Sequence, residues 1–433
     1  MNGQRLGALS KNAHGRTRLD YDDEYLSSPR PTPLSASMPL TAPSWQGKRL
    51  HAWLQGLLPD NSMVIERWAA RFGVSPDSPF ALLSHVGEDT AGAVQFVRPE
   101  RMADLVPGGV TWLDDETLRA RVELLRVDPA TWLDADGRGQ FSLAGAQSKF
   151  ALLFEDRRWG EPYGAVPTTH IIKPPAGRFE DQDLNEHLCL QAAANVGLVV
   201  ARSQIVFFGD ERATAVERYD RIRTETGWRR IHQEDCCQAL GIPPDRKYQS
   251  QGGPGTDTIA RLLRGTVVGT PGDQAVSDFV DALAFNWLAG GTDAHAKNFS
   301  LLLSGSQVRL APLYDLTSAL PYVVGPQVRV APGQLRGNAE MAMKVGDNKE
   351  LAMIRREDWS TLSTQCGLDP DTVLARVDEL ASRVPDAFAD AAAADDVVAC
   401  QSPLPERLVT KARENVNRCR SALAGRPARR HRR

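Results

Sequence analysis

The segment Gly291-Thr292-Asp293-Ala294-His295-Ala296-Lys297-Asn298 decides how this sequence of 433 residues is interpreted. It follows a stretch from Val276 to Trp287 whose apolar residues recur at helical spacing, and Gly290-Gly291 is a typical helix end. Asp293 and Asn298 are therefore expected in a loop directly after a helix. A carboxylate there can orient a hydroxyl group and accept its proton, and an amide oxygen can hold magnesium. Most such Asp and Asn pairs only cap a turn, so the neighbouring sequence has to decide.

A second carboxylate follows this loop. Pro312-Leu313-Tyr314-Asp315 comes after two predicted strands, Phe299 to Leu303 and Gln307 to Leu310, joined by a turn at Ser304-Gly305-Ser306. The order helix, loop, hairpin and aspartate is that of protein kinases, in which the second aspartate binds magnesium. Leu316-Thr317 replaces the Phe-Gly of the kinase motif, so an inactivating flip of the D-F-G type is not assumed.

Two upstream features fit a nucleotide site. The small residues of Ser142-Leu143-Ala144-Gly145-Ala146-Gln147-Ser148-Lys149 allow close backbone approach, and their consecutive amides can surround an anion, although the segment is no Walker A loop. Lys173 ends the apolar run that begins at Thr169, and we expect it to reach nucleotide phosphates. Glu186, in a helix predicted from Asp181 to Val196, could pair with Lys173. Taken alone, the segment from Ser142 to Lys149 would be an ordinary hairpin turn, and Lys173 would be a solvated residue at the end of a strand.

A possible hinge lies further along the chain. Gln204 to Phe208 and Ala213 to Tyr219 are predicted strands, joined at Gly209-Asp210. Glu217-Arg218-Tyr219-Asp220 closes the second strand, where a hinge would offer backbone groups to adenine. The alternative is an ordinary charged linker.

The pattern along the chain predicts an α+β fold in three parts. Residues 1–125 mix turns and amphipathic helices, with a strand at Arg5 to Leu9 and a helix at Met63 to Phe72. Residues 126–230 form a β-rich lobe, including a strand at Phe150 to Phe154. Residues 231–433 form a helical lobe, so that after Ile231 we expect mainly helix apart from the hairpin before Asp315.

Composition narrows the class of protein. Lys plus Arg number 51 and Asp plus Glu 54, so a formal charge of −3 gives no global basic field for nucleic acid. The six cysteines show no metal-ligand spacing and are expected to be reduced thiols of a cytosolic protein. We find neither a signal peptide nor an apolar stretch near the roughly 20 residues that span a bilayer. We therefore expect a soluble cytoplasmic protein without a membrane partner.

Together these segments resemble the HipA family of serine/threonine protein kinase toxins, which have a two-lobed, protein-kinase-like fold and an additional N-terminal α/β subdomain. The matching segments follow the family order: Ser142 to Lys149, His170 to Pro174, Asn185-Glu186, Val216 to Arg221, His232 to Gln238, Lys247-Tyr248, Thr292 to Ser300 and Pro312 to Asp315. Ser37 to Leu40 and Gly56 to Asp60 resemble the family's N-terminal subdomain.

The resemblance implies ATP and Mg²⁺ as cofactors and a role for each site residue. Asp293 would be the catalytic base, and Asn298 and Asp315 would bind the metal. The nucleotide site would consist of Ala144, Gly145, Ala146, Gln147, Ser148, Lys149, Lys173, Glu217, Arg218, Tyr219, His295, Ala296, Lys297, Asn298, Tyr314 and Asp315. Ser142 would be autophosphorylated as an off-switch, because about −2 of added charge repels the phosphates of ATP.

The resemblance also implies partners. A HipB-like helix-turn-helix antitoxin would bind this chain and carry most of the DNA contact, although the basic tail, residues 426–433, could touch phosphates. The substrate would be a cellular protein, often an aminoacyl-tRNA synthetase, and its phosphorylation would limit growth. Two alternatives remain open: a small-molecule or phosphoinositide-like kinase, and a pseudokinase co-repressor. Intact Lys173, Asp293, Asn298 and Asp315 argue against the pseudokinase.

Overall fold

The computed structural model describes residues 1–105, 108–132, 141–176, 179–267, 270–324, 334–336 and 339–425. The chain forms two compact units, each assembled from three segments. Unit 1 contains Met1–Gly177, Val206–Arg246 and Ser300–Ala311. Unit 2 contains Arg178–Ile205, Lys247–Phe299 and Pro312–Arg433. The division at residues 125 and 230 stays a prediction, and the basic tail lies outside the described residues.

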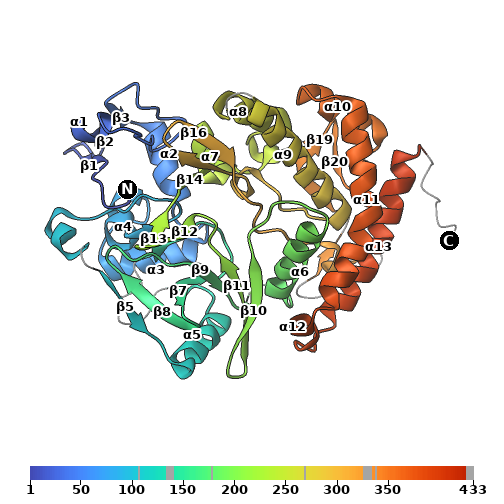
Figure 1. The fold of residues 1–433 in the computed structure, drawn as a ribbon, viewed down its shortest axis with the longest axis horizontal. Helices are drawn as coiled ribbons and strands as arrows, with labels where there is room; N and C mark the ends of the chain where they lie inside the picture. Colours follow the sequence, from blue (N-terminus) through green and yellow to red (C-terminus); the bar gives the residue numbers. More distant parts are fainter. Residues whose placement is uncertain are drawn as a thin grey trace. The chain divides into compact units, whose positions relative to one another are not determined.

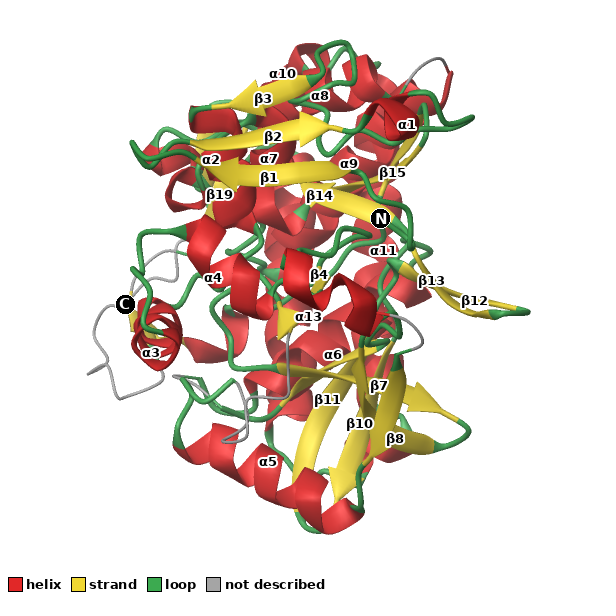
Figure 2. Cartoon of the chain, turned by 90° about the vertical axis from the view of Figure 1, so that its left-hand side faces the viewer, coloured by secondary structure: helices red, strands yellow, loops and turns green. Residues whose placement is uncertain are grey.

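Unit 1 begins with a small sheet and a group of helices. Figure 2 shows three antiparallel strands side by side: β1 (Gly7–Lys11), β2 (Thr17–Tyr21) and β3 (Ser44–Gln46). The helices are α1 (Asp23–Leu26), α2 (Lys48–Gly56), α3 (Ser62–Phe72) and α4 (Pro79–Val86). The helix predicted from Met63 to Phe72 is confirmed. Its start is fixed by the Asn61 side chain, which accepts a hydrogen bond from Met63 N, and its end by Gly73 at φ 64°.

The main sheet of unit 1 has the strand order β10-β11-β9-β7-β8-β5. Its strands are β5 (Gly109–Trp112), β7 (Phe150–Glu155), β8 (Arg158–Tyr163), β9 (His170–Lys173), β10 (Ser203–Phe208) and β11 (Glu211–Glu217). Four of these were predicted within about two residues at each end. Helix α5 (Asp115–Val127) packs against β11, and the Asp114 side chain caps it by accepting from Thr117 N.

Short strands complete unit 1. β4 (Asp89–Thr90) pairs in parallel with β6 (Phe141–Ser142), and β12 (Arg221–Thr224) forms a hairpin with β13 (Gly227–Arg230). A further sheet has the order β14 (His232–Asp235), β15 (Ser300–Ser304) and β16 (Gln307–Leu310). The expectation of helix directly after Ile231 is therefore wrong, because β14 pairs with β15, with His232 opposite Leu303. Helix begins only at α7 (Cys236–Leu240), where Asp235 and Gln238 form a capping box.

Unit 2 is mainly helical. Its helices are α6 (Gln182–Asn195), α8 (Thr256–Thr266), α9 (Thr270–Ala289), α10 (Arg356–Gln365), α11 (Pro370–Ala392), α12 (Asp395–Val398) and α13 (Leu404–Leu423). Its short strands are β17 (Val323–Val324), β18 (Leu335–Arg336), β19 (Glu340–Val345) and β20 (Asn348–Glu350). The long helices α11 and α13 run side by side (Figure 1). Within the described ranges, no helix is long and apolar enough to cross a bilayer.

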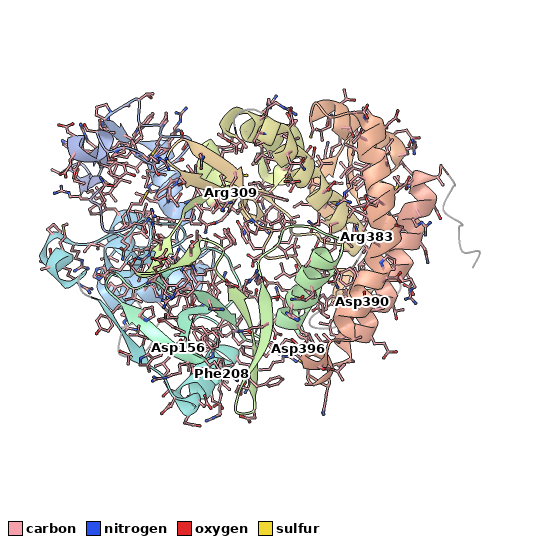
Figure 3. All side chains as sticks on the ribbon, viewed as in Figure 1. Asp156, Phe208, Arg309, Arg383, Asp390 and Asp396 are labelled. Atoms are coloured by element: carbon pink, nitrogen blue, oxygen red, sulfur yellow. The ribbon has the colours of Figure 1, made fainter. Side chains whose placement is uncertain are left out.

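Buried polar groups of unit 2 join its helices. Asn415 Nδ2 of α13 donates to the carbonyl oxygens of Trp287 and Leu288, 2.9 and 2.8 Å away, at the end of α9. His187 Nε2 of α6 lies 3.8 Å from a carboxylate oxygen of Asp396, which is labelled in Figure 3. Burial lowers the pKa of His187 despite the attraction of Asp396. This histidine is therefore neutral at neutral pH and forms no ion pair there.

Candidate functional site

The loop that carries Asp293 begins where α9 ends. Gly290 has φ 71°, and a Cβ atom at Gly291 would lie 2.1 Å from Oδ1 of Asn286. A residue with a side chain would strain the first position and collide at the second, so the two glycines end the helix here. The chain then runs without regular structure to a single helical turn, Ala296–Asn298. The sequence prediction of a helix followed by this loop is confirmed.

Hydrogen bonds within the loop hold the backbone of Asp293. Asn298 Nδ2 donates to the carbonyl oxygen of Asp293 at 2.9 Å, and His295 N donates to the same oxygen at 2.8 Å. Asn298 N in turn donates to the carbonyl oxygen of His295. His295, Lys297 and Asn298 are buried, whereas Asp293 is exposed. The loop therefore presents one exposed carboxylate on a buried, internally bonded support.

A contact that the sequence did not reveal reaches the Asp293 carboxylate. The hydroxyl group of Tyr248 donates a hydrogen bond to Asp293 Oδ1. The sequence placed Lys247-Tyr248 in a matching segment without a role, because the two residues lie far from Asp293 along the chain. Only a prediction of which segments meet in space could have found this contact.

The segment around Asp315 adjoins the same loop. Tyr314 Oη donates to the carbonyl oxygen of Lys297 at 2.5 Å, so two predicted site residues are in contact. Leu313 exchanges backbone hydrogen bonds with the chain at Val199 and Ala201. Asp315 has φ 51°, in a left-handed region that few residues other than glycine enter. Asp and Asn enter this region more readily than most other residues with a side chain, so the backbone here suits an aspartate.

The donor atoms present fit a magnesium ion that completes its shell with phosphates and water. Magnesium takes oxygen ligands and often only one or two protein groups. Asp315 supplies a carboxylate. Since Asn298 donates through Nδ2, its amide oxygen is the atom that remains for a metal. In the part of the chain that the structure describes, no three His, Cys, Asp or Glu residues group into a metal site by themselves.

The predicted phosphate loop of unit 1 folds around Lys149. Lys149 Nζ donates to the carbonyl oxygen of Ala144 at 2.7 Å and lies 5.6 Å above the ring of Trp132. Gly145 has φ 102°, and a Cβ there would lie 2.6 Å from Lys149 Nζ. Asp60 N donates to the carbonyl oxygen of Gly145 at 3.0 Å. The loop therefore requires glycine at position 145 and is attached to the N-terminal part of the unit.

Both serines of this loop are buried and bonded. Ser142 is 0% exposed, and its hydroxyl donates to the carbonyl oxygen of Leu57 at 2.7 Å. The Ser148 hydroxyl donates to the carbonyl oxygen of Pro129, also at 2.7 Å. Ser142 also lies in β6, paired with Thr90 of β4. Phosphorylation of Ser142 would therefore require this strand to leave its place.

Lys173 and Glu186 are both buried and both lie in regular elements. Lys173 ends β9, opposite Thr214 of β11, and is 3% exposed. Glu186 lies in α6 and is 1% exposed. The two residues belong to different units, and their pairing stays a prediction.

At the predicted hinge, the side chain of Arg218 is directed into unit 1. Its guanidinium donates to carboxylates of Asp220 and Asp89 at 3.0 and 3.3 Å and to the Thr90 carbonyl oxygen at 2.7 Å. Its backbone N donates to Thr169, and its carbonyl accepts from Arg221 N. The polar groups of Arg218 thus have partners within unit 1, and the role of Glu217, Arg218 and Tyr219 as a nucleotide hinge stays a prediction.

Asp89 is the centre of this buried charge network. Its carboxylate accepts from Arg221 Nη2 at 2.8 Å and from the Thr168 hydroxyl at 2.6 Å, and Arg230 lies 3.4 Å away. Burial opposes ionisation, but the attraction of Arg221, Arg218 and Arg230 outweighs it and holds the pKa of Asp89 well below its usual range. Burial lowers the pKa of Arg221 to about 10, so it stays charged at neutral pH. Nothing in the sequence around Asp89 marked it.

Comparison with known proteins agrees with this geometry. One family model, the HipA-like C-terminal domain, matches residues 141–388, and another, the HipA N-terminal domain, matches residues 1–97. A putative kinase, Y4mE of Sinorhizobium fredii, is 36% identical over 394 residues, which cover 89% of each chain. The serine/threonine-protein kinase toxin HipA of Shewanella oneidensis is 29% identical over 405 residues, covering 89% of this chain and 86% of that protein.

A solved structure extends the similarity to the fold. The complex of Shewanella oneidensis HipA with HipB and its operator DNA contains a chain that matches with a TM-score of 0.79 at 26% identity, over 97% of this chain and 96% of that one. The predicted α+β, protein-kinase-like fold is thereby confirmed. Since one family model spans more than half of the sequence and a relative above 30% identity covers most of it, the chain belongs to the HipA family of serine/threonine-protein kinase toxins.

Proposed function

We propose that this chain transfers the γ-phosphate of ATP to a serine or threonine of a cellular protein and thereby limits growth. The observation that carries the proposal is the exposed carboxylate of Asp293 on a buried loop that Asn298 holds in place. A base for phosphoryl transfer has to be accessible to the acceptor and carried by a fixed backbone, and Asp293 meets both conditions.

The proposed roles follow from the chemistry of each side chain. Bound Mg²⁺-ATP supplies the phosphoryl group, with its charge partly neutralised by the metal. Asp293 orients the acceptor hydroxyl and takes its proton. Asn298 and Asp315 offer oxygen atoms to the metal, and Lys173 offers positive charge to phosphates. The amides of the loop from Ala144 to Lys149, with Glu217 to Tyr219, the segment His295 to Lys297 and Tyr314, complete the proposed nucleotide contacts.

The proposed partners are a protein substrate and an antitoxin. The Shewanella oneidensis relative was solved with HipB and operator DNA. We propose that this chain likewise acts with a helix-turn-helix antitoxin, which carries most of the DNA contact. An aminoacyl-tRNA synthetase is the proposed substrate class, and the proposed place of action is the cytoplasm.

The test compares phosphorylated proteins in cells that express wild type, Asp293→Ala or Asp390→Ala. Asp390 is an exposed aspartate of α11, labelled in Figure 3, and serves as the matched control. We expect new phosphoserine or phosphothreonine sites with wild type and Asp390→Ala and none with Asp293→Ala. Identical patterns in all three would contradict the proposal. Transfer to a soluble metabolite or an inositol lipid, with no protein labelled, would establish a small-molecule kinase instead.

A further inference from the structure

Tyr248 makes a direct side-chain contact with the proposed base. Its hydroxyl donates to Oδ1 of Asp293, and both residues belong to unit 2. Tyr248 directly precedes the short helical turn Gln249–Gln251. The roles inferred from the family resemblance do not include this residue.

Tyr248 is held in place through its backbone and through its ring. The carbonyl oxygen of Tyr248 accepts from Gln251 N and Gly253 N, both at 3.0 Å. Its ring meets the imidazole of His295 edge to face, with 4.9 Å between the centroids and 83° between the planes. One residue earlier, the carbonyl oxygen of Lys247 accepts from Ala296 N at 3.3 Å. The segment of Tyr248 is thus bonded to the same loop that carries Asp293.

We propose that Tyr248 is a positioning residue for the base Asp293. The inference rests on the proposed kinase function and deepens it. An exposed aspartate in an irregular loop would otherwise rotate among several rotamers. Asn298 fixes only the backbone of Asp293, whereas Tyr248 fixes its carboxylate. With Oδ1 bound to the phenol, Oδ2 is the oxygen that receives the acceptor hydroxyl, and displacement of a reacting group by about 1 Å can reduce a rate roughly 100-fold.

A competing interpretation is that the Tyr248 hydroxyl occupies the place of the acceptor and must leave before a substrate binds. A carboxylate accepts through two oxygens, so one donor does not exclude a second. The backbone and ring contacts of Tyr248 also favour a fixed residue over a moving one. The two interpretations predict opposite effects of removing the hydroxyl.

The experiment measures initial rates of ³²P transfer from ATP to the protein fraction of a heat-treated soluble cell extract, as a function of ATP concentration. The full-length proteins are wild type, Tyr248→Phe, Asp293→Asn, the double variant and Tyr25→Phe. Phenylalanine at 248 keeps the ring beside His295. Tyr25 is the matched control, because its hydroxyl donates to the Thr32 carbonyl oxygen at 2.8 Å in unit 1, outside the proposed site.

We expect Tyr248→Phe to lower the maximal rate by ~10-fold or more, with the KM for ATP changed less than about twofold. In the Asp293→Asn background the same substitution should have no further effect, because Tyr248 acts through that carboxylate. Tyr25→Phe should lower the unfolding temperature without changing the rate.

Three results would overturn the inference. They are an unchanged rate for Tyr248→Phe, a raised rate, which would favour displacement by substrate, and an equal loss in the Asp293→Asn background. If the wild-type protein transfers no phosphate, or if Asp293→Asn transfers it at the wild-type rate, the proposed function fails. If the wild-type protein is active, Asp293→Asn is inactive and Tyr248→Phe transfers phosphate at the wild-type rate, the proposed function stands and only the role of Tyr248 fails.

Discussion

Asp315 combines a backbone that few residues adopt with a side chain assigned to magnesium. Asn enters the left-handed region almost as readily as Asp, whereas Ala does so at a cost of about 1 kcal/mol. We predict that Asp315→Asn keeps the unfolding temperature of wild type and lowers phosphate transfer at least ~100-fold, because a metal-binding charge is lost. Asp315→Ala should lower both. Thermal unfolding and the ³²P assay measure these outcomes, and an active Asp315→Asn protein would contradict the metal role.

Glu234 is a second residue whose properties can be tested, through the pH dependence of the protein's stability. Its carboxylate is 1% exposed and accepts from Ala36 N at 2.7 Å and Trp53 Nε1 at 3.1 Å. Burial raises the pKa of Glu234 to about 7, although these donors partly oppose the shift. The folded protein therefore binds this proton more tightly than the unfolded chain does. The associated stability is complete below pH 4.5 and is lost as pH rises to about 7.

We predict that Glu234→Gln removes this pH dependence. Both carboxyl oxygens of Glu234 accept a hydrogen bond from a donor group, and glutamine places an NH₂ group at one of these positions, so a constant penalty is expected at all pH values. The unfolding temperature of the variant minus that of wild type should rise between pH 5 and pH 8, by an amount equivalent to roughly 1–3 kcal/mol. A difference that stays constant over this range would show that Glu234 does not titrate as described.

The residues proposed to carry the chemistry were recognised in the sequence where their spacing carried the signal. Asp293 and Asn298 lie five positions apart on one loop, and Lys173 ends a recognisable strand. Tyr248 and Asp89 could not be predicted, because their partners are distant in sequence and lie on short, irregular segments. Hydrophobic periodicity carries no information about such contacts.

At the scale of elements, strands with a local sequence signal were predicted, and strands that depend on contacts distant in sequence were not. β7 and β9 are apolar runs bounded by turn residues, so composition alone predicts them. β12 and β13 each have two arginines among four residues instead of an apolar run, and β14 has only four residues. The pairing of β14 with β15 is a long-range contact, which local patterns do not report.

The network around Asp89 joins β4 to the predicted hinge that follows β11. Replacing Asp89 by Asn would leave three buried guanidinium groups with one carboxylate, Asp220. We predict a loss of about 3–5 kcal/mol in the free energy of unfolding for Asp89→Asn. Because the pKa of Asp89 lies well below its usual range, this loss should be constant from pH 5 to pH 8.

A control in the same unit is Asp20→Asn. Arg18 and Asp20 form a pair 2.7 Å apart on the surface, where both side chains are about half exposed. Its loss should reduce stability by less than about 1 kcal/mol. Urea unfolding of both variants measures the contrast, and equal effects would argue against a central role of Asp89.

Strand β6 carries the proposed off-switch at Ser142. We predict that wild type loses activity during incubation with Mg²⁺-ATP and gains phosphate on Ser142, whereas Ser142→Ala stays active. Ser363→Ala is the control, because it also removes a buried hydroxyl that donates to a backbone carbonyl, that of Trp359 at 2.6 Å. Both variants should lose about 1 kcal/mol of stability. Inactivation of Ser142→Ala at the rate of wild type would contradict the switch.

For the whole molecule, the sequence predicted the fold class, and the structure adds how the chain is distributed between two compact units. Kinase-like order and the HipA resemblance together predicted an α+β fold, which the comparison confirms. The chain, however, enters and leaves each unit more than once, so units cannot be read as consecutive blocks. Residues 300–311 return to unit 1 because β15 and β16 pair beside β14.

This distribution predicts how fragments behave. A fragment of residues 1–246 lacks β15 and β16, which would expose the edge of β14 and the buried face beneath it. We expect that fragment to aggregate. A fragment of residues 1–311 should be more soluble when flexible linkers replace both residues 178–202, which belong to unit 2 and include α6, and residues 247–299. Sedimentation and circular dichroism of both would decide, and a stable, monomeric 1–246 fragment would contradict this account.

The burial of Ser142 affects how fast the proposed self-inactivation can proceed. A serine with no exposed surface can react only in the fraction of molecules whose strand has opened, so on our proposal the self-inactivation rate is the opening equilibrium multiplied by the rate of chemistry. Every 1.4 kcal/mol that holds Ser142 against Leu57 would delay silencing about tenfold. The opening of the two-residue strand β6 would then set how long the kinase stays active. Substitutions at Phe141 or Leu57 would lengthen or shorten this active period without altering the catalytic loop.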